Sequence, residues 1–147
     1  MALTKVTSNV LADDAVTTGK ILDANVTTGK LATSSVTSIK VGTEFTTATV
    51  LTPAAAIDVN YTAAQVFTLT PNANTTLNIT NPVIGVTKAI VVTGAGGSYT
   101  VGFTVGGSAG TFNKISGDYD DTSGKKNFIQ ITCVAATEFW YTISQIA

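Results

Sequence analysis

The first third of the chain is organised by a short repeat that places an apolar residue at every fifth position. The phrase Val-Thr-Thr-Gly-Lys occurs at residues 16–20 and 26–30, and related phrases begin at Val6 and Val36. This period is neither the two-residue period of a strand nor the 3.6-residue period of a helix. One apolar residue in five cannot build a core within one chain, so we expect several copies to meet around a common axis. The residues predicted to line that axis are Val6, Leu11, Val16, Ile21, Val26, Leu31, Val36 and Val41.

The repeat predicts a fibrous, oligomeric stalk over residues 6–52. Two local conformations remain open. The stalk consists either of short helical turns capped by threonine and joined by extended links, or of an extended chain that bends at its glycines. We interpret the lysines of the repeat, Lys20, Lys30 and Lys40, as solvated side chains.

The composition is typical of an all-β structural protein. Of 147 residues, 28 are Thr and 13 are Gly, and Thr is β-branched and favoured in strands. With 44% hydrophobic and 12% charged residues the chain does not have the composition of a disordered protein. All eight basic residues are Lys and the net charge is −1, which argues against nucleic-acid binding. No apolar run is long enough for membrane insertion, and the first residues lack the apolar core of a signal peptide.

From Pro53 onward the apolar residues alternate with polar ones, which is the period of half-buried strands. Leu77 and Ile79, for example, share one face of such a segment, and turn-forming residues separate the segments. The pattern predicts an all-β head over residues 53–147, built as an antiparallel β-sandwich or jelly roll. The expected strands cover residues 65–70, 75–80, 86–93, 98–104, 112–115, 127–134 and 138–144.

Two further segments have specific expectations. The strand over residues 86–93 is more continuously apolar than the other expected strands and is predicted to be central in its sheet. Residues 94–97 (Gly-Ala-Gly-Gly) precede an expected strand rather than a helix, so we interpret them as a tight hairpin and not as a phosphate-binding loop. Cys133, the single cysteine, lies in phase with Ile129 and Ile131 and is predicted to be a buried apolar side chain.

The sequence indicates no catalytic residue, no metal site and no cofactor. The chain has no His, which removes the commonest general base and metal ligand. Asp118, Asp120 and Asp121 form the one acidic cluster. A calcium site is the alternative there, and an acidic surface turn is the interpretation we prefer. We therefore do not expect an enzyme.

Four aromatic residues are candidates for a surface that contacts glycans: Tyr99, Tyr119, Trp140 and Tyr141. Aromatic rings stack against the apolar faces of sugars, but packing in the core or between subunits is the interpretation that we prefer for these residues. Strand alternation predicts that Trp140 and Thr142 face one side of the last strand, opposite to Phe139.

Two features together resemble bacteriophage tail-fibre and head-fibre proteins. The first is the tandem phrase Val-Thr-Thr-x-Lys-Ile/Leu across residues 6–41. The second is the succession of the segments VFTLT, TLNI, AIVV and FWY through the head, which is similar to the β-rich C-terminal domains of these fibres. The resemblance covers nearly the whole chain.

This resemblance implies a homotrimer on the outer surface of the virion. Residues 1–10 would anchor it to the major capsid or tail protein, and the head would project outward and aid adsorption to a host-surface glycan. Because the chain is short, a head fibre or capsid decoration protein is expected. A carbohydrate-binding receptor-recognition module of a tail fibre is the alternative, and the choice between head and tail stays open.

Overall fold

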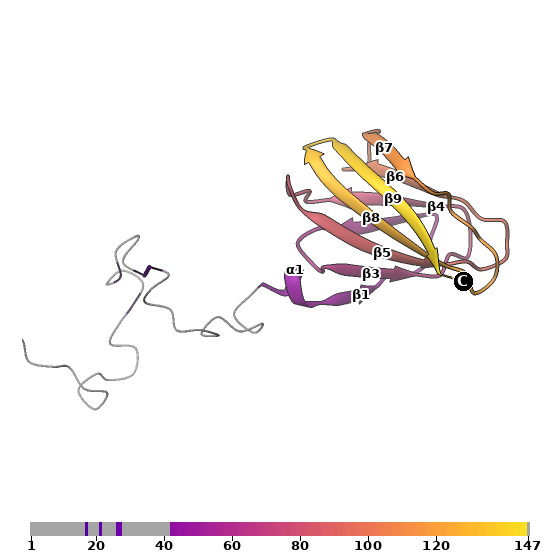
Figure 1. Ribbon diagram of the computed structural model, residues 1–147, viewed down its shortest axis with the longest axis horizontal. Helices are drawn as coiled ribbons and strands as arrows, with labels where there is room; N and C mark the ends of the chain where they lie inside the picture. The colour runs from indigo at the N-terminus through magenta and orange to yellow at the C-terminus, as the bar shows by residue number, and fades with distance from the viewer. Residues whose placement is uncertain (1–16, 18–20, 22–25, 28–41, 147) are drawn as a thin grey trace, which may run out of the picture. The chain divides into compact units, whose positions relative to one another are not determined.

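The computed structural model describes residues 17, 21, 26–27 and 42–146 (Figure 1). The chain divides into two units, Met1–Lys40 and Val41–Ala147. The predicted anchor over residues 1–10 lies outside the described residues. Six of the predicted axis residues also lie outside them: Val6, Leu11, Val16, Leu31, Val36 and Val41.

The second unit is all-β, as predicted, apart from one helical turn. All seven expected strands are present as β3 to β9, and β1 and β2 were not expected. In chain order the described elements are α1 (Thr43–Thr46), β1 (Ala48–Val50), β2 (Ala56–Asn60), β3 (Val66–Leu69), β4 (Thr75–Thr80), β5 (Thr87–Thr93), β6 (Val101–Val105), β7 (Thr111–Ser116), β8 (Lys126–Ala135) and β9 (Glu138–Ile146).

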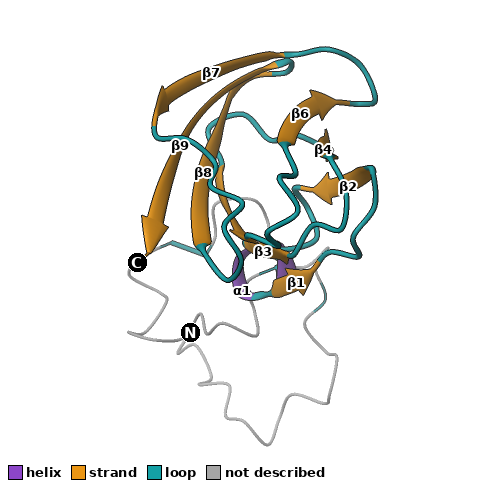
Figure 2. Ribbon diagram, turned by 90° about the vertical axis from the view of Figure 1, so that its right-hand side faces the viewer, coloured by secondary structure: helices purple, strands orange, loops and turns teal. Residues whose placement is uncertain are grey.

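The strands form two sheets that face each other (Figure 2). The larger has the order β1-β3-β5-β8-β9-β7, and the smaller has the order β2-β4-β6. Successive strands from β1 to β6 alternate between the sheets, and within each sheet they run parallel. Each coil of the chain therefore adds one strand to each sheet, which is a solenoid-like arrangement. The antiparallel hairpin β8–β9 then extends the larger sheet and separates β5 from β7.

The prediction of an antiparallel arrangement is wrong for most of the described sheets, because five of the seven strand pairings are parallel. The prediction of a hairpin at residues 94–97 is also wrong, since this segment connects β5 of one sheet with β6 of the other. Parallel sheets usually have both faces buried, whereas here one face is solvated, so their strands alternate as antiparallel ones do. A short connection to the opposite sheet has the same turn residues as a hairpin. The prediction that residues 86–93 form a central strand is confirmed.

The core lies between the two sheets and is built from alternate residues of the strands. In β4 and β8 the side chains alternate between buried and more exposed along the strand. Leu77 and Ile79 share the buried face as predicted, and Cys133 is buried together with Ile129 and Ile131. Each fully buried aliphatic side chain contributes about 1.5–3 kcal/mol to folding. Because alternate side chains point into the core, the residues between them are the ones more exposed on the outer faces of the sheets and accessible for binding.

Aromatic side chains fill the end of the core where β6, β7 and β9 meet. The rings of Phe103 and Phe112 stack with centroids 5.4 Å apart, and those of Phe112 and Phe139 stack at 5.0 Å. Tyr141 contacts Phe103 at 5.0 Å. Such pairs contribute about 0.5–1.5 kcal/mol beyond the area they bury. They hold β7 and β9 firmly against the smaller sheet.

The compact unit begins earlier than the predicted boundary at Pro53. β1 pairs with β3, and the N–H of Leu51 donates to the carbonyl of Thr68 at 2.8 Å. Leu51 itself is buried in the core. Residues 48–52, which the repeat had assigned to the stalk, therefore belong to the sheet and its flank. The short segment Ala-Thr-Val had too few residues for a visible alternation.

Candidate functional site

The predicted acidic cluster serves to join loops. Asp121 lies between β7 and β8, and its Oδ1 accepts hydrogen bonds from the N–H of Ala95 (3.0 Å) and the hydroxyl of Tyr119 (2.8 Å). Its Oδ2 accepts one from the N–H of Tyr99 (2.8 Å). These backbone donors, from Ala95 first and Tyr99 second, lower the pKa of Asp121. The carboxylate thus ties the β7–β8 loop to the β5–β6 loop.

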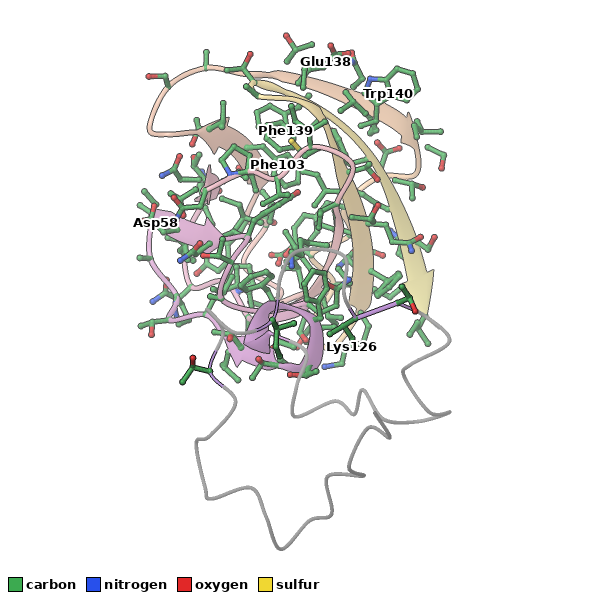
Figure 3. The ribbon with its side chains drawn as sticks, turned by 90° about the vertical axis from the view of Figure 1, so that its left-hand side faces the viewer. Asp58, Phe103, Lys126, Glu138, Phe139 and Trp140 are labelled. Carbon is green, nitrogen blue, oxygen red and sulfur yellow. The ribbon has the colours of Figure 1, made fainter. Side chains whose placement is uncertain are left out.

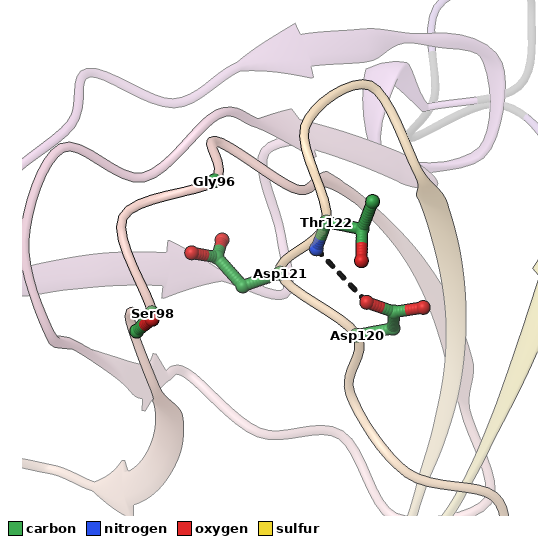
Figure 4. Close-up of a pocket in the computed structure, with 5 residues that line it drawn as sticks. All are labelled: Gly96, Ser98, Asp120, Asp121 and Thr122. Atoms are coloured by element: carbon green, nitrogen blue, oxygen red, sulfur yellow. Dashed lines mark hydrogen bonds between the residues drawn. The ribbon is translucent and has the colours of Figure 1, made fainter.

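Asp120 completes this junction. Its Oδ1 accepts a hydrogen bond from the N–H of Thr122 at 2.9 Å (Figure 4). Hydrogen bonding to Thr122 lowers the pKa of Asp120. The backbone N–H and carbonyl of Asp120 bond the side chain of the buried Asn127, at 2.9 and 2.8 Å. A depression of about 400 Å³ lies here, lined by Gly96, Ser98, Asp120, Asp121 and Thr122.

This depression is a poor candidate for a ligand or metal site. Both oxygens of Asp121 are already occupied by donors of the protein itself. Asp118 points elsewhere and forms an ion pair with Lys114. Within the described ranges no three His, Cys, Asp or Glu side chains gather around a possible metal position. The carboxylates are therefore best explained by the two loops that they connect.

The four aromatic residues predicted to contact glycans do not share one surface. Tyr141 faces inward and packs against Phe103. Tyr119 is half-buried against the core, and desolvation together with its bond to Asp121 raises its pKa above the usual range. Tyr99 lies in the β5–β6 loop beside Gly97, where an added Cβ would meet its ring at 2.4 Å. Trp140 alone faces outward from the larger sheet, with 49% of its surface exposed.

Trp140 is held in a small polar cluster on the outer face of that sheet. Its Nε1–H donates to Oε1 of Glu138 at 2.9 Å, and the Nδ2 of Asn113 donates to the same oxygen at 3.0 Å. Figure 3 shows Glu138 and Trp140 outside the sheet, with Phe139 between them in sequence pointing inward. Glu138, Trp140 and Asn113 are named the Trp140 site.

Strand geometry creates this site. Glu138 and Trp140 are two residues apart on β9, so both side chains emerge on one face. The parallel pairing of β7 with β9 places Asn113 directly beside Trp140. On the other side Trp140 neighbours Thr132 of β8, which neighbours Thr87 of β5, and their hydroxyl oxygens lie 2.7 Å apart. Asn113, Trp140, Thr132 and Thr87 therefore form one continuous row across four strands.

The sequence indicated Trp140 but missed Asn113 and the bonding of Glu138. The spacing of two between Glu138 and Trp140 was a usable signal for a shared face. Nothing local could have placed Asn113 beside them, because the β7–β9 pairing joins segments separated by the whole of β8. Chemically, the site offers an indole ring, a carboxylate, an amide and hydroxyls, which suits binding by stacking and hydrogen bonding.

A buried lysine was also not predicted from the sequence. Lys88 of β5 points into the core and is only 1% exposed. Its Nζ donates to Oε1 of Gln65 at 3.3 Å and lies 5.6 and 5.9 Å from the ring centres of Phe45 and Tyr61. Burial raises the pKa of Tyr61 above its usual range, and its hydroxyl donates to the carbonyl of Ile131. These contacts join α1 to the sheets and are structural.

Two of the predicted axis residues are described. Ile21 and Val26 are 44% and 53% exposed in the single chain. Their apolar surfaces are thus accessible for contact with other copies of the chain. In the described part of the chain, no helix has the length and apolar character needed to span a membrane.

Comparison of the chain with protein-family models, with curated proteins and with solved structures found no match.

Proposed function

We propose that the chain is a virion structural protein, a short homotrimeric bacteriophage fibre or capsid decoration protein that projects from the particle. The ten-residue repeat supports the trimer, because its apolar residues need partners around an axis and closed threefold symmetry leaves no unsatisfied surface. The exposure of Ile21 and Val26 in the single chain is compatible with such contacts.

The observation that carries the proposal is that the two edges of the larger sheet differ: the chain enters at one edge, and the Trp140 site lies at the other. The chain enters the compact unit next to β1, at one edge of this sheet, and β7 forms the opposite edge. Five strand spacings of about 4.8 Å separate the two edges, so they are roughly 24 Å apart. The Trp140 site lies on β7 and β9, at the edge remote from β1. An N-terminal anchor would therefore be joined to the compact unit at the sheet edge that is farther from the Trp140 site.

The proposed partners are a virion protein at the N-terminal end of the chain and the host surface at the compact unit. Residues 1–10 anchor the trimer to the major capsid or tail protein, and the compact unit lies on the outer surface of the virion. Adsorption to the host surface is its proposed contribution to infection. The proposal includes neither nucleic-acid binding nor membrane insertion, because the net charge is low, all the basic residues are Lys and no long apolar run occurs in the sequence.

The test is the mass of the full chain in solution by light scattering. We expect three times the 15.0 kDa of the single chain. Val26→Asp should lower the mass or the stability of the trimer, because it puts a charge on the proposed axis. Thr27→Asp, one residue along, is the matched control and should leave the trimer intact. A monomeric full chain would overturn the proposal.

A carbohydrate-binding receptor-recognition module is the second candidate. The observation that favours it is the single outward Trp140 with its bonded Glu138 and Asn113. In this case glycan binding would be the main task and the virion attachment would serve it. If a single copy of the chain bound a glycan tightly, without the multivalency of a trimer, this candidate would be favoured over the first.

A further inference from the structure

We infer that the Trp140 site binds a neutral pyranose unit of a host-surface polysaccharide. This inference rests on the proposed function for the outward presentation of the site, and it adds the residues and the class of ligand. The site comprises Trp140, Glu138 and Asn113, and the Thr132–Thr87 pair continues it along the row.

The first component is a stacking platform whose orientation is fixed. The indole of Trp140 is half exposed, and its Nε1–H is bonded to Glu138 on the same strand. This hydrogen bond to Glu138 restricts the rotamers that the indole ring can adopt. A platform that is ordered before binding loses less conformational entropy when a ligand arrives. The apolar face of a pyranose ring is the surface that such an exposed indole fits.

The second component is a pair of acceptors beside the ring. Oε1 of Glu138 receives two donors, from Trp140 and Asn113, which fixes the carboxylate and the amide relative to each other. Among the described residues none donates to Oε2 of Glu138 or to Oδ1 of Asn113. Two neighbouring acceptors next to an aromatic platform match the adjacent hydroxyl donors of a sugar.

Charge then selects the class of sugar. Glu138 is the one ionic side chain in this cluster. The nearest lysine along β7, Lys114, is paired with Asp118. Lys126 lies at the far end of β8, where it donates to Thr93. Among the described residues, an acidic sugar such as a uronic acid would therefore meet a carboxylate with no cation to offset it. The site favours neutral pyranoses and rejects acidic ones.

The shape of the site implies weak binding by each copy. It lies on the open face of a sheet, and the depression lined by Asp120 and Asp121 lies elsewhere, between the β5–β6 and β7–β8 loops. A single ring with a few hydrogen bonds gives low affinity. Three copies on one trimer, and many trimers on one particle, would compensate through multivalency.

The experiment uses the fact that Trp140 is the single tryptophan of the chain. Its fluorescence and its indole N–H resonance in NMR therefore report on this site alone. The full chain is titrated with cellotetraose and tetra-N-acetylchitotetraose as neutral probes and with tetragalacturonate as the acidic probe. We expect a saturable change with at least one neutral probe and none with the acidic probe.

Three variants sharpen the test. Asn113→Ala should weaken neutral binding by about tenfold, because one acceptor is lost and Glu138 is released. Glu138→Gln removes the charge and should admit the acidic probe, a change that mere damage to the fold would not produce. Ile146→Ala removes an exposed apolar side chain at the other end of β9 and is the matched control, with unchanged affinity expected.

Light scattering on the same samples separates this inference from the proposed function. A trimer whose indole signals respond to none of the three probes overturns the sugar site and leaves the fibre proposal standing. A monomer that binds the neutral probe overturns the trimer and keeps the site. If Trp140→Ala dissociates the trimer, the outward face is a contact between copies and the sugar site is overturned.

Discussion

The carboxylate of Asp121 accepts a hydrogen bond from the backbone N–H of Tyr99 at 2.8 Å, across 22 residues of sequence. With its bond to Ala95, this contact attaches the β7–β8 loop to the β5–β6 loop. In the sequence Asp121 looked like a surface charge or a calcium ligand. In the structure its side chain adds to the backbone hydrogen bonds between the two loops, such as the bond from the N–H of Gly96 to the carbonyl of Asp121 at 2.7 Å.

Asp121→Asn should lower the melting temperature measurably. The amide keeps one acceptor but turns an N–H₂ group toward the backbone donors, so at least one of them loses its partner. Thermal unfolding followed by circular dichroism measures the effect. Asp118→Asn is the control, since Asp118 is 87% exposed and makes a surface ion pair with Lys114. Equal melting temperatures for the two variants would contradict the loop-joining role of Asp121.

Acid should destabilise the protein through the same junction. Hydrogen bonds lower the pKa of Asp120 and Asp121 below the ordinary 3.8. A lowered folded-state pKa stabilises the fold fully above the unfolded value, and this contribution is lost as the pH falls through the folded value. The melting temperature should therefore fall as the pH is taken from about 5 to about 2. Asp121→Asn should flatten this fall, and an unchanged slope would count against the assignment.

Asn127→Ala should cost about 1–3 kcal/mol of unfolding free energy. The buried side chain of Asn127 accepts from the N–H of Asp120 and donates to the carbonyls of Asp120 and Val92. Its removal leaves these groups without their partner. Urea unfolding should show a lower midpoint at an unchanged slope. Gln130→Ala, exposed on the same strand, should change the free energy by no more than about 0.5 kcal/mol.

Truncation should locate the start of the compact unit. A chain beginning at Val41 keeps β1 and Leu51 and should unfold at the same temperature as the compact unit of the full chain. A chain beginning at Pro53 loses β1, which uncovers the edge of β3 and removes a buried side chain. It should melt at a lower temperature and aggregate more readily. Identical melting curves would mean that β1 adds nothing to stability.

Alternation along single segments predicted where β3 to β9 lie and which side chains share a face, and it predicted that Cys133 is buried. It could not predict the direction of pairing, because a half-buried strand has the same pattern beside a parallel or an antiparallel neighbour. β1 was missed since its three residues are too few to show a period.

The candidate site was predictable to the same extent. Alternation along β9 places Trp140 on the face opposite to Phe139 and places Glu138 on the same face as Trp140, but it does not predict their hydrogen bond. The contribution of Asn113 depends on β7 lying beside β9, which is a contact between distant segments. Tyr141 was one of the candidates for a glycan surface, although alternation had already placed it on the face of Phe139.

The stacking of coils makes the length of this domain adjustable. Of the three coils from β1 to β6, the middle coil β3–β4 pairs with the coil before it and the coil after it, and in the larger sheet the β8–β9 hairpin with β7 follows the last coil. Duplication of one coil would lengthen both sheets and the core by the same step, without altering either end. The distance between the β1 edge and the β7 edge could thus be changed by whole coils while the Trp140 site kept its chemistry.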